Sequence, residues 1–142
     1  MGNELEGLIN EVAGLIVDSK CVVVFTGAGI STESGIPDSK SLGGIGTRVK
    51  PDDSRKKAWP MSSILRMVEL MQPNPVHYAI AELEKLGKLD CIITQNVDGL
   101  HQKAGVPEEK VIELHGSLKW VKCLGCGRRY ATEEIARRIE QG

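Results

Sequence analysis

Three short runs of apolar and β-branched residues predict the strands of a sheet. They cover residues 21–25, 90–94 and 110–114, and polar or glycine residues follow each of them. The first run, Cys21–Phe25, is apolar without alternation, which is typical of a strand covered on both faces by helices in a parallel sheet. We therefore expect the strands to lie inside an α/β domain.

Apolar residues at helical spacing predict a helix over residues 3–20 that packs on this sheet. Its first turn resembles a capping box formed by Asn3 and Glu6. The expected stripe comprises Leu5, Leu8, Ile9, Val12, Leu15 and Ile16. Further helices are predicted at 64–71, at 75–86 between the cap Asn74 and the stop Gly87, and at 133–141 behind the cap Thr132.

A glycine turn follows the first strand and indicates a phosphate-binding loop. Gly27-Ala28-Gly29 precedes Ser31, Thr32 and Ser34, which are residue types that cap helices. We expect the glycines to supply unusual backbone angles and the following helix to offer free N–H groups to an anion. Thr32 stands where the dinucleotide fingerprint requires its third glycine, and no acidic strand end follows about 20 residues later, so a dehydrogenase is disfavoured. A tight turn without a ligand remains the alternative.

Polar residues also follow the other two predicted strands. Gln95, Asn96 and Asp98 come directly after the second strand, and His115 follows the third. Since ligands of open α/β sheets bind at the carboxyl ends of the strands, we expect these residues to share one crevice with Gly27. The alternative for residues 95–98 is a structural polar loop. His77 is expected to be a buried structural histidine of its helix.

Cys123 and Cys126 form a C-x-x-C turn that suits a zinc ion. A structural zinc site needs four ligands, and no cysteine follows Cys126, so only half of the ligand set is present. Cys21 and Cys91 are expected to be buried as small apolar residues. Residues 39–57 show no periodicity, which indicates either a lid over the crevice or a disordered segment.

The bulk properties of the chain indicate one soluble domain of 142 residues with a net charge of −1. This charge gives no general attraction to nucleic acid or to anionic membranes. No apolar run approaches the roughly 20 residues of a membrane span, and no signal peptide is recognisable. We therefore expect a cytoplasmic protein, in which metal binding by the cysteine pair is favoured over a disulfide.

Taken together, these motifs resemble the sirtuins, and they occur in that family's order over nearly the whole chain. The matching segments are Gly27-Ala28-Gly29-Ile30-Ser31, Gly35-Ile36-Pro37-Asp38, Gln72-Pro73-Asn74-Pro75 with His77, Thr94–His101, Glu113-Leu114-His115-Gly116 and Cys123-x-x-Cys126. The resemblance implies NAD-dependent removal of acetyl groups from protein lysines, with NAD consumed as a co-substrate and an acetyl-lysine protein or peptide as the partner.

The resemblance also implies a fold and a division of the chain. It implies an α/β fold with a partial Rossmann-like parallel sheet, flanking helices and half of a small zinc-ribbon module. Residues 1–38 and 88–117 would form the NAD-binding part, residues 39–87 a shortened cofactor loop and helical segment, and residues 118–142 the partial zinc module.

Roles for single residues follow from the same resemblance. Asn96, Asp98 and His115 would be catalytic, with His115 as the general base and Asp98 holding the nicotinamide carboxamide. The residues expected to bind NAD are Gly27, Ala28, Gly29, Ile30, Ser31, Pro37, Asp38, Gln95, Asn96, Val97, Asp98 and His115. Zinc would be held by Cys123 and Cys126.

This chain also departs from the sirtuin pattern. Ser39-Lys40 stands where the family carries Phe-Arg, so we expect slow turnover. The chain ends before the second cysteine pair and the later strands of the family, which leads us to expect an impaired deacetylase whose exposed sheet edge favours self-association. The alternatives are a non-catalytic sirtuin fragment with partial NAD or zinc binding, and a redox or zinc-ribbon protein built on the cysteine pair.

Overall fold

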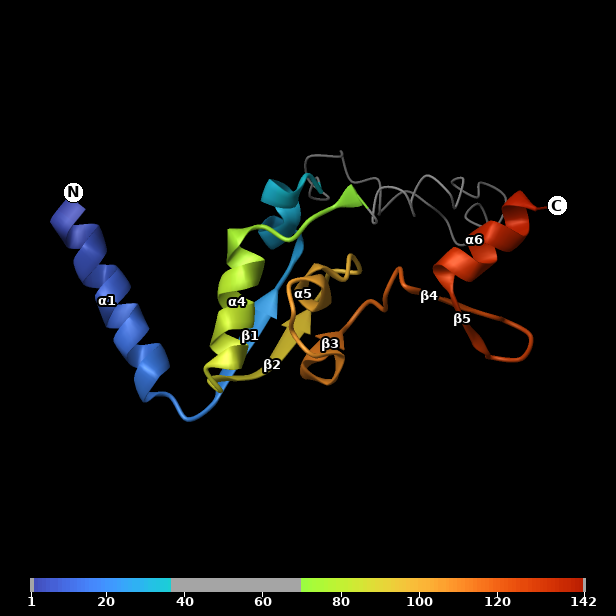
Figure 1. Ribbon diagram of the computed structural model, residues 1–142. Helices are drawn as coiled ribbons and strands as arrows, with labels where there is room; N and C mark the ends of the chain where they lie inside the picture. The colour runs from blue at the N-terminus through green and yellow to red at the C-terminus, as the bar shows by residue number, and fades with distance from the viewer. Residues whose placement is uncertain (1, 37–69, 142) are drawn as a thin grey trace.

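The computed structural model describes residues 2–36 and 70–141. Several predicted features lie outside the described residues. They are Pro37, Asp38, the lid at 39–57 with Ser39, and most of the predicted 64–71 helix. Figure 1 shows a small sheet with helices in the middle of the molecule, a separate N-terminal helix, and a hairpin with a helix at the C-terminal end.

The three predicted strands form one parallel sheet. They are β1 (Val22–Thr26), β2 (Leu89–Thr94) and β3 (Val111–Glu113), in the order β1-β2-β3. Phe25 pairs with Ile93, which pairs in turn with Ile112. The expected parallel α/β sheet is therefore confirmed, and all three strands deliver their carboxyl ends to the same edge.

Helices cover one face of this sheet. The helix α4 (Pro75–Lys85) is capped by Asn74 as predicted, and the short helix α5 (Leu100–Lys103) follows β2. The core lies between these helices and β2, and it consists of Ile80, Ala81, Leu89, Ile92 and Val106. The 3-10 helix η3 (Glu108–Lys110) leads from this layer into β3.

The other face of the sheet is exposed, so the expectation that the first strand is covered on both faces was wrong. Phe25 is 61% exposed and Ile112 is 48% exposed. Successive side chains of a strand point to opposite faces, so Val24 and Ile92 meet the helices while Phe25 and Ile112 point away from them. No element of residues 2–36 or 70–141 covers that second face.

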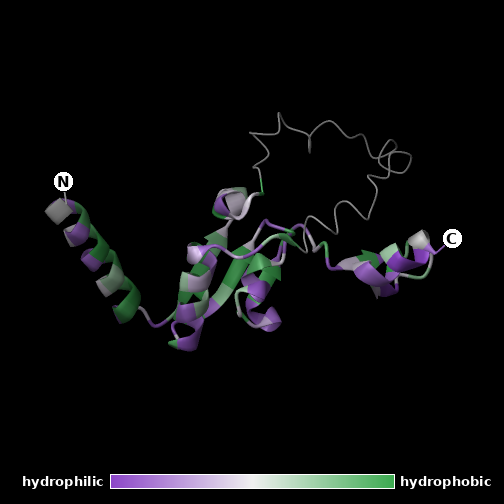
Figure 2. Ribbon diagram, turned by 45° about the horizontal axis from the view of Figure 1, so that its top comes forward, coloured by the Kyte–Doolittle hydropathy of each residue, from purple (hydrophilic) through white to green (hydrophobic). Residues whose placement is uncertain are grey.

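The first helix, α1 (Gly2–Asp18), does not pack on the sheet as expected. It stands apart from the sheet in Figure 1, and Figure 2 shows apolar residues along it that meet no other element. Leu5 and Leu15 are 61% and 65% exposed. The helix begins at Gly2, before the predicted Asn3 cap. Its connection to β1 is short, and the Lys88 ammonium donates a hydrogen bond to the Val17 carbonyl near this connection.

The C-terminal part is a hairpin followed by a helix. β4 (Trp120–Lys122) and β5 (Arg129–Ala131) are antiparallel, and α6 (Thr132–Glu140) packs on them. Thr132 does not cap α6 as predicted. Its hydroxyl donates to the Leu118 carbonyl at 2.6 Å, because Thr132 lies inside the first turn and beside the strand connection. None of the described helices is long and apolar enough to cross a membrane.

Candidate functional site

The turn after β1 leads into a helix, as expected, and this helix is the 3-10 helix η1 (Ala28–Ser34). Gly27 is extended, with φ −142° and ψ −170°, and Gly29 is not among the glycines with positive φ. The predicted need for unusual backbone angles at these two positions was therefore wrong. A Cβ at Gly29 would meet no atom within 4 Å. The missing side chains leave the main chain open on this side, which suits the approach of a ligand.

Ser31 joins this turn to the loop after β2 instead of capping a helix. Ser31 is 1% exposed, and its Oγ donates a hydrogen bond to Asp98 Oδ2 at 2.8 Å. Asn96 Nδ2 donates to Ser31 Oγ and to the Gly27 carbonyl, each at 3.1 Å. Asp98 Oδ1 also accepts from the Leu100 N–H at 2.9 Å. The structure thus brings together the two loops that we expected to share a crevice.

These residues line a cavity of about 290 Å³ at the carboxyl edge of the sheet. Most of its wall is apolar, and Ser31, Asn96 and Asp98 are among the polar residues that line it. A mainly apolar pocket with a few fixed polar groups is typical of a small-molecule site. The lining residues are Ala28, Ser31, Ile36, Met71, Gln95, Asn96, Val97, Asp98 and Leu118.

His115 lines a neighbouring groove of about 450 Å³, not the cavity that holds Asn96 and Asp98. Its Nδ1 lies 2.9 Å from the Gln95 carbonyl oxygen. A carbonyl can only accept, so Nδ1 carries the proton and Nε2 is left with a free lone pair. Gln95 also lines the cavity. The backbone of Gln95 therefore connects the imidazole to the Ser31–Asn96–Asp98 cluster, and the two hollows are adjacent, not one.

Ile30, which we expected to bind NAD, lies in η1 beside the core. It packs partly buried against the core cluster, and it does not line the described cavity. Asn74 holds this part of η1, since its Nδ2 donates to the Ile30 carbonyl at 2.7 Å and to Ser34 Oγ at 3.1 Å. Asn74 Oδ1 meanwhile accepts from the Val76 and His77 N–H groups at the start of α4. We had predicted the helix cap, but not this bond to the glycine turn.

Two buried histidines lie behind the cluster. His77 is fully buried, as predicted, and its Nδ1 accepts from the Asn74 N–H at 3.3 Å. His101 is 2% exposed, and its ring centroid lies 5.1 Å from that of His77. Burial lowers the pKa of His77, and burial together with His77 lowers the pKa of His101 to about 4, although the Asp98 charge opposes both shifts. Both rings are therefore neutral near pH 7.

His101 is connected to the site through two threonines. Its Nε2 contacts Thr26 Oγ1 at 2.9 Å, and Thr26 Oγ1 donates to Thr94 Oγ1 at 2.9 Å. Thr94 Oγ1 then accepts from the Asn96 N–H at 3.0 Å. From the sequence we had assigned His101 no role in the site. The signal for burial was its position beside Leu100 at the start of a helix that returns to the sheet.

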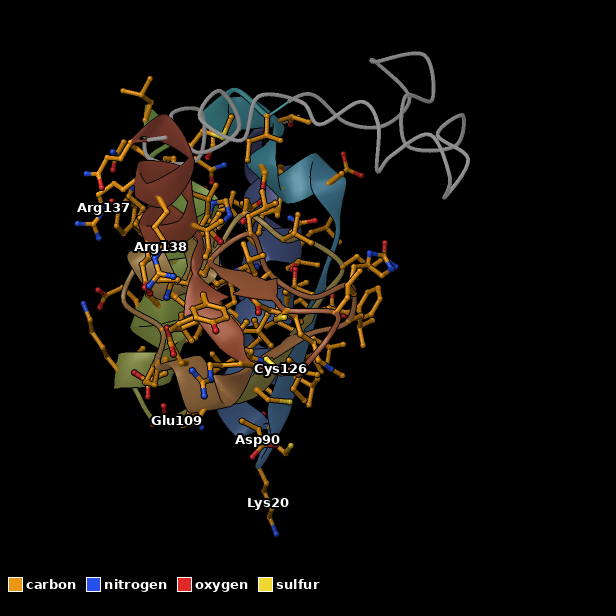
Figure 3. The ribbon with its side chains drawn as sticks, turned by 90° about the vertical axis from the view of Figure 1, so that its right-hand side faces the viewer. Lys20, Asp90, Glu109, Cys126, Arg137 and Arg138 are labelled. Carbon is orange, nitrogen blue, oxygen red and sulfur yellow. The ribbon has the colours of Figure 1, made fainter. Side chains whose placement is uncertain are left out.

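Cys123 and Cys126 lie at the turn between β4 and β5, and Figure 3 shows Cys126 there, away from α6. Hydrogen bonds from the backbone N–H groups of Cys126 and then Gly125 lower the pKa of the Cys123 thiol. N–H groups directed at sulfur suit a thiolate that ligates zinc. Within residues 2–36 and 70–141, no cluster of three or more potential metal ligands is present, so the turn offers two zinc ligands.

Comparison with known proteins gives a consistent family match. The family model described as the Sir2 family matches residues 27–142. The chain is 44% identical over 143 residues to NAD-dependent protein deacetylase 1 of Pyrobaculum aerophilum, and the alignment covers 94% of this chain and 56% of that protein.

Solved structures agree with this match. A Sir2 homologue in complex with NAD is 40% identical, with a TM-score of 0.72, over 86% of this chain and 51% of the other. A Sir2 variant with deacetylated p53 peptide and 3′-O-acetyl-ADP-ribose is 34% identical, with a TM-score of 0.70, over 94% and 57%. The chain thus spans about half the length of the relatives that it matches.

Proposed function

Because this chain belongs to the Sir2 family, we propose that it acts in NAD-dependent deacetylation of protein lysines, in which the acetyl group is transferred to ADP-ribose and nicotinamide is released. The observation that carries the proposal is the partly buried Ser31–Asp98 hydrogen bond at the wall of an apolar cavity. NAD would enter as a substrate that supplies the ribose carbon for the transfer. A protein or peptide bearing acetyl-lysine would be the second substrate.

The hydrogen-bonding capacity that is left over supports a role for the cluster in binding NAD. Asn96 uses its Nδ2 group on Gly27 and Ser31, so its Oδ1 remains available to accept from a ribose hydroxyl or a water molecule. Asp98 has further lone pairs for the N–H groups of a carboxamide. The open backbone of Gly27, Ala28 and Gly29 would meet the pyrophosphate. Contacts of Ile30, Pro37, Asp38, Gln95 and Val97 with NAD remain part of the proposal.

His115 is proposed as the general base. Because its Nδ1–H is held by the Gln95 carbonyl, Nε2 of this groove-lining ring is free to take a proton from a ribose hydroxyl. Imidazole suits this task because Nε2 can accept a proton while Nδ1–H stays bonded to the Gln95 carbonyl. Its exposure in this structure leaves room for a bound substrate above the ring.

Cys123 and Cys126 are proposed to hold zinc with a structural role. Bound zinc would fix the β4–β5 turn, and no step of the reaction depends on it. Since a closed zinc site takes four ligands, two more must come from outside this turn.

A non-catalytic binding module is the second candidate. The observation that favours it is the exposed apolar sheet face with Phe25 and Ile112, which leaves the sheet incompletely covered. Such a module would keep part of the NAD or zinc contacts without turnover.

Nicotinamide release from NAD with an acetyl-lysine peptide tests the main proposal. We expect release by the wild-type chain and a loss of at least about 100-fold in His115→Ala, because general-base catalysis contributes roughly that factor. Calorimetric titration with NAD is the control, and it should give similar affinity for both proteins. NAD binding without nicotinamide release in the wild type would favour the binding module. Absence of NAD binding would refute both the catalytic role of the Ser31–Asn96–Asp98 cluster and its role in NAD binding without turnover.

A further inference from the structure

The groove beside His115 has two basic residues, Lys122 and Arg129, on one wall. It runs from the end of β3 to the hairpin, and its lining residues are Glu113, His115, Gly116, Ser117, Trp120, Lys122 and Arg129. Lys122 and Arg129 are register partners on β4 and β5, so the two cations stand side by side across the hairpin. Like charges directly opposite each other in a sheet are destabilising, and a bound carboxylate would offset their repulsion.

Neither cation is neutralised within the described parts of the chain. The ion pairs formed there by lysine and arginine involve Lys85, Lys110, Lys119 and Arg138, and none of these residues lines the groove. Glu113 is the acidic residue of the groove wall, but its Oε1 accepts from Gln102 Nε2 at 3.0 Å, on the side of α5. Among the described residues, the hairpin side of the groove therefore presents two exposed positive charges without an ion-pair partner.

Trp120 adds an apolar surface to the same wall. It is 49% exposed, and it lies on β4 two residues before Lys122. Residues two apart on a strand point to the same face. An extended peptide could therefore lay its backbone along Trp120 while an acidic side chain reaches Lys122 and Arg129. Arginine binds a carboxylate through two parallel hydrogen bonds, which gives this contact directional preference.

We propose that this groove selects acetyl-lysine peptides that carry aspartate or glutamate beside the modified lysine, and that Lys122 and Arg129 determine this specificity. The inference rests on the proposed function, because His115 at the end of the groove marks where the acetyl-lysine would lie. It adds a preference for acidic residues beside the acetyl-lysine, which the family membership does not state.

The test measures binding of three fluorescein-labelled acetyl-lysine peptides that differ only in their flanking residues: two aspartates, two serines or two lysines. Fluorescence anisotropy with the 142-residue chain should show the aspartate peptide binding about 3–10-fold more tightly than the serine peptide at low salt. The lysine peptide should bind most weakly. Raising the ionic strength should reduce these differences, because exposed charges are screened.

Variants assign the preference to the groove. Lys122→Glu and Arg129→Glu should each make the lysine peptide bind more tightly than the aspartate peptide. Lys122→Gln and Arg129→Gln should abolish the difference in affinity between the two peptides. Arg137→Glu is the matched control, since it makes the same charge change on α6, outside the groove and away from the hairpin turn (Figure 3). Arg137→Glu should retain the wild-type order.

Binding is measured without turnover, so the outcome is separate from that of the proposed catalysis. Acidic preference without nicotinamide release would support the groove and refute the activity. Nicotinamide release with equal binding of the three peptides would refute the groove alone. Failure of every peptide to bind, or an equal effect of Arg137→Glu, would also overturn the proposal.

Discussion

Ser31 Oγ donates a hydrogen bond of 2.8 Å to Asp98 Oδ2, and this bond joins two loops that are 67 residues apart in the chain. Ser31 is buried, and Asn96 Nδ2 donates a second hydrogen bond to Ser31 Oγ. The bond therefore orients a carboxylate at the cavity wall and closes the glycine turn over the end of β2. Its removal affects both stability and the shape of the site.

Ser31→Ala should lower the free energy of unfolding by about 1–3 kcal/mol, because Asp98 Oδ2 and one N–H of the Asn96 amide lose the partner that Ser31 Oγ provides. It should also weaken NAD binding, since the carboxylate is no longer oriented. Urea denaturation and calorimetry measure the two effects. Thr32→Ala is the control, because Thr32 is exposed and its hydroxyl donates to the nearby Gly29 carbonyl, not to the loop after β2. Equal effects of both substitutions would contradict this role of Ser31.

Asn74→Ala should destabilise the chain by about 1–2 kcal/mol through loss of the helix cap. Asn74→Asp separates the two functions of this side chain. It keeps the oxygen that accepts from Val76 and His77, but it loses the amide donor to the Ile30 carbonyl. We expect Asn74→Asp to keep helix α4 and to increase hydrogen exchange in residues 30–36. Unchanged exchange there would show that Asn74 serves only as a cap.

Stability should fall as the pH is lowered from about 6.5 to about 4. The folded chain holds His101 with a pKa of about 4, whereas an unfolded histidine titrates near 6.5. The unfolded state thus binds more protons in this window, and the stabilisation present above pH 6.5 is lost progressively toward pH 4. The loss from His101 amounts to about 3 kcal/mol, and His77 adds to it in the same direction.

Urea denaturation at several pH values checks this expectation. His101→Gln should flatten the dependence between pH 4 and 6.5, whatever its effect on stability at pH 7.5. The same slope in wild type and His101→Gln would rule out His101 as the source.

The exposed sheet face should favour self-association. Phe25→Lys should therefore shift the chain toward monomer at concentrations where the wild type associates, because it removes a large apolar side chain from that face. Sedimentation velocity at several concentrations measures this. Leu124→Lys is a control, since Leu124 is 89% exposed but lies in the hairpin turn. A wild-type chain that is monomeric throughout would contradict the prediction.

Zinc content should be below one ion per monomer, because the turn supplies two of the four ligands that a structural site takes. Two chains that share one site would give half an ion per chain together with a dimer. Cys126→Ser should remove the bound zinc in either case. Mass spectrometry of metal content on a fraction of known mass provides the measurement, and one full zinc in a proven monomer would refute the half-site.

The local pattern of the chain was sufficient to predict its strands, their parallel direction and the capping of α4 by Asn74. These features depend on neighbouring residues, because side-chain alternation, caps and glycine turns are local in origin. Their common edge also follows from parallel topology, and this is why Asn96 and Asp98 could be expected near the glycine turn. The motifs also sufficed to identify the family.

Tertiary structure alone decided which side chains meet. The partner of Ser31 is Asp98 and not its own helix, and Asn74 reaches the glycine turn from α4. The burial of His101, the exposure of Phe25 and the separation of α1 from the sheet likewise depend on which elements are present to cover them. Hydrophobic burial is non-directional, so an apolar residue in the sequence shows that a surface seeks cover, but not which element covers it.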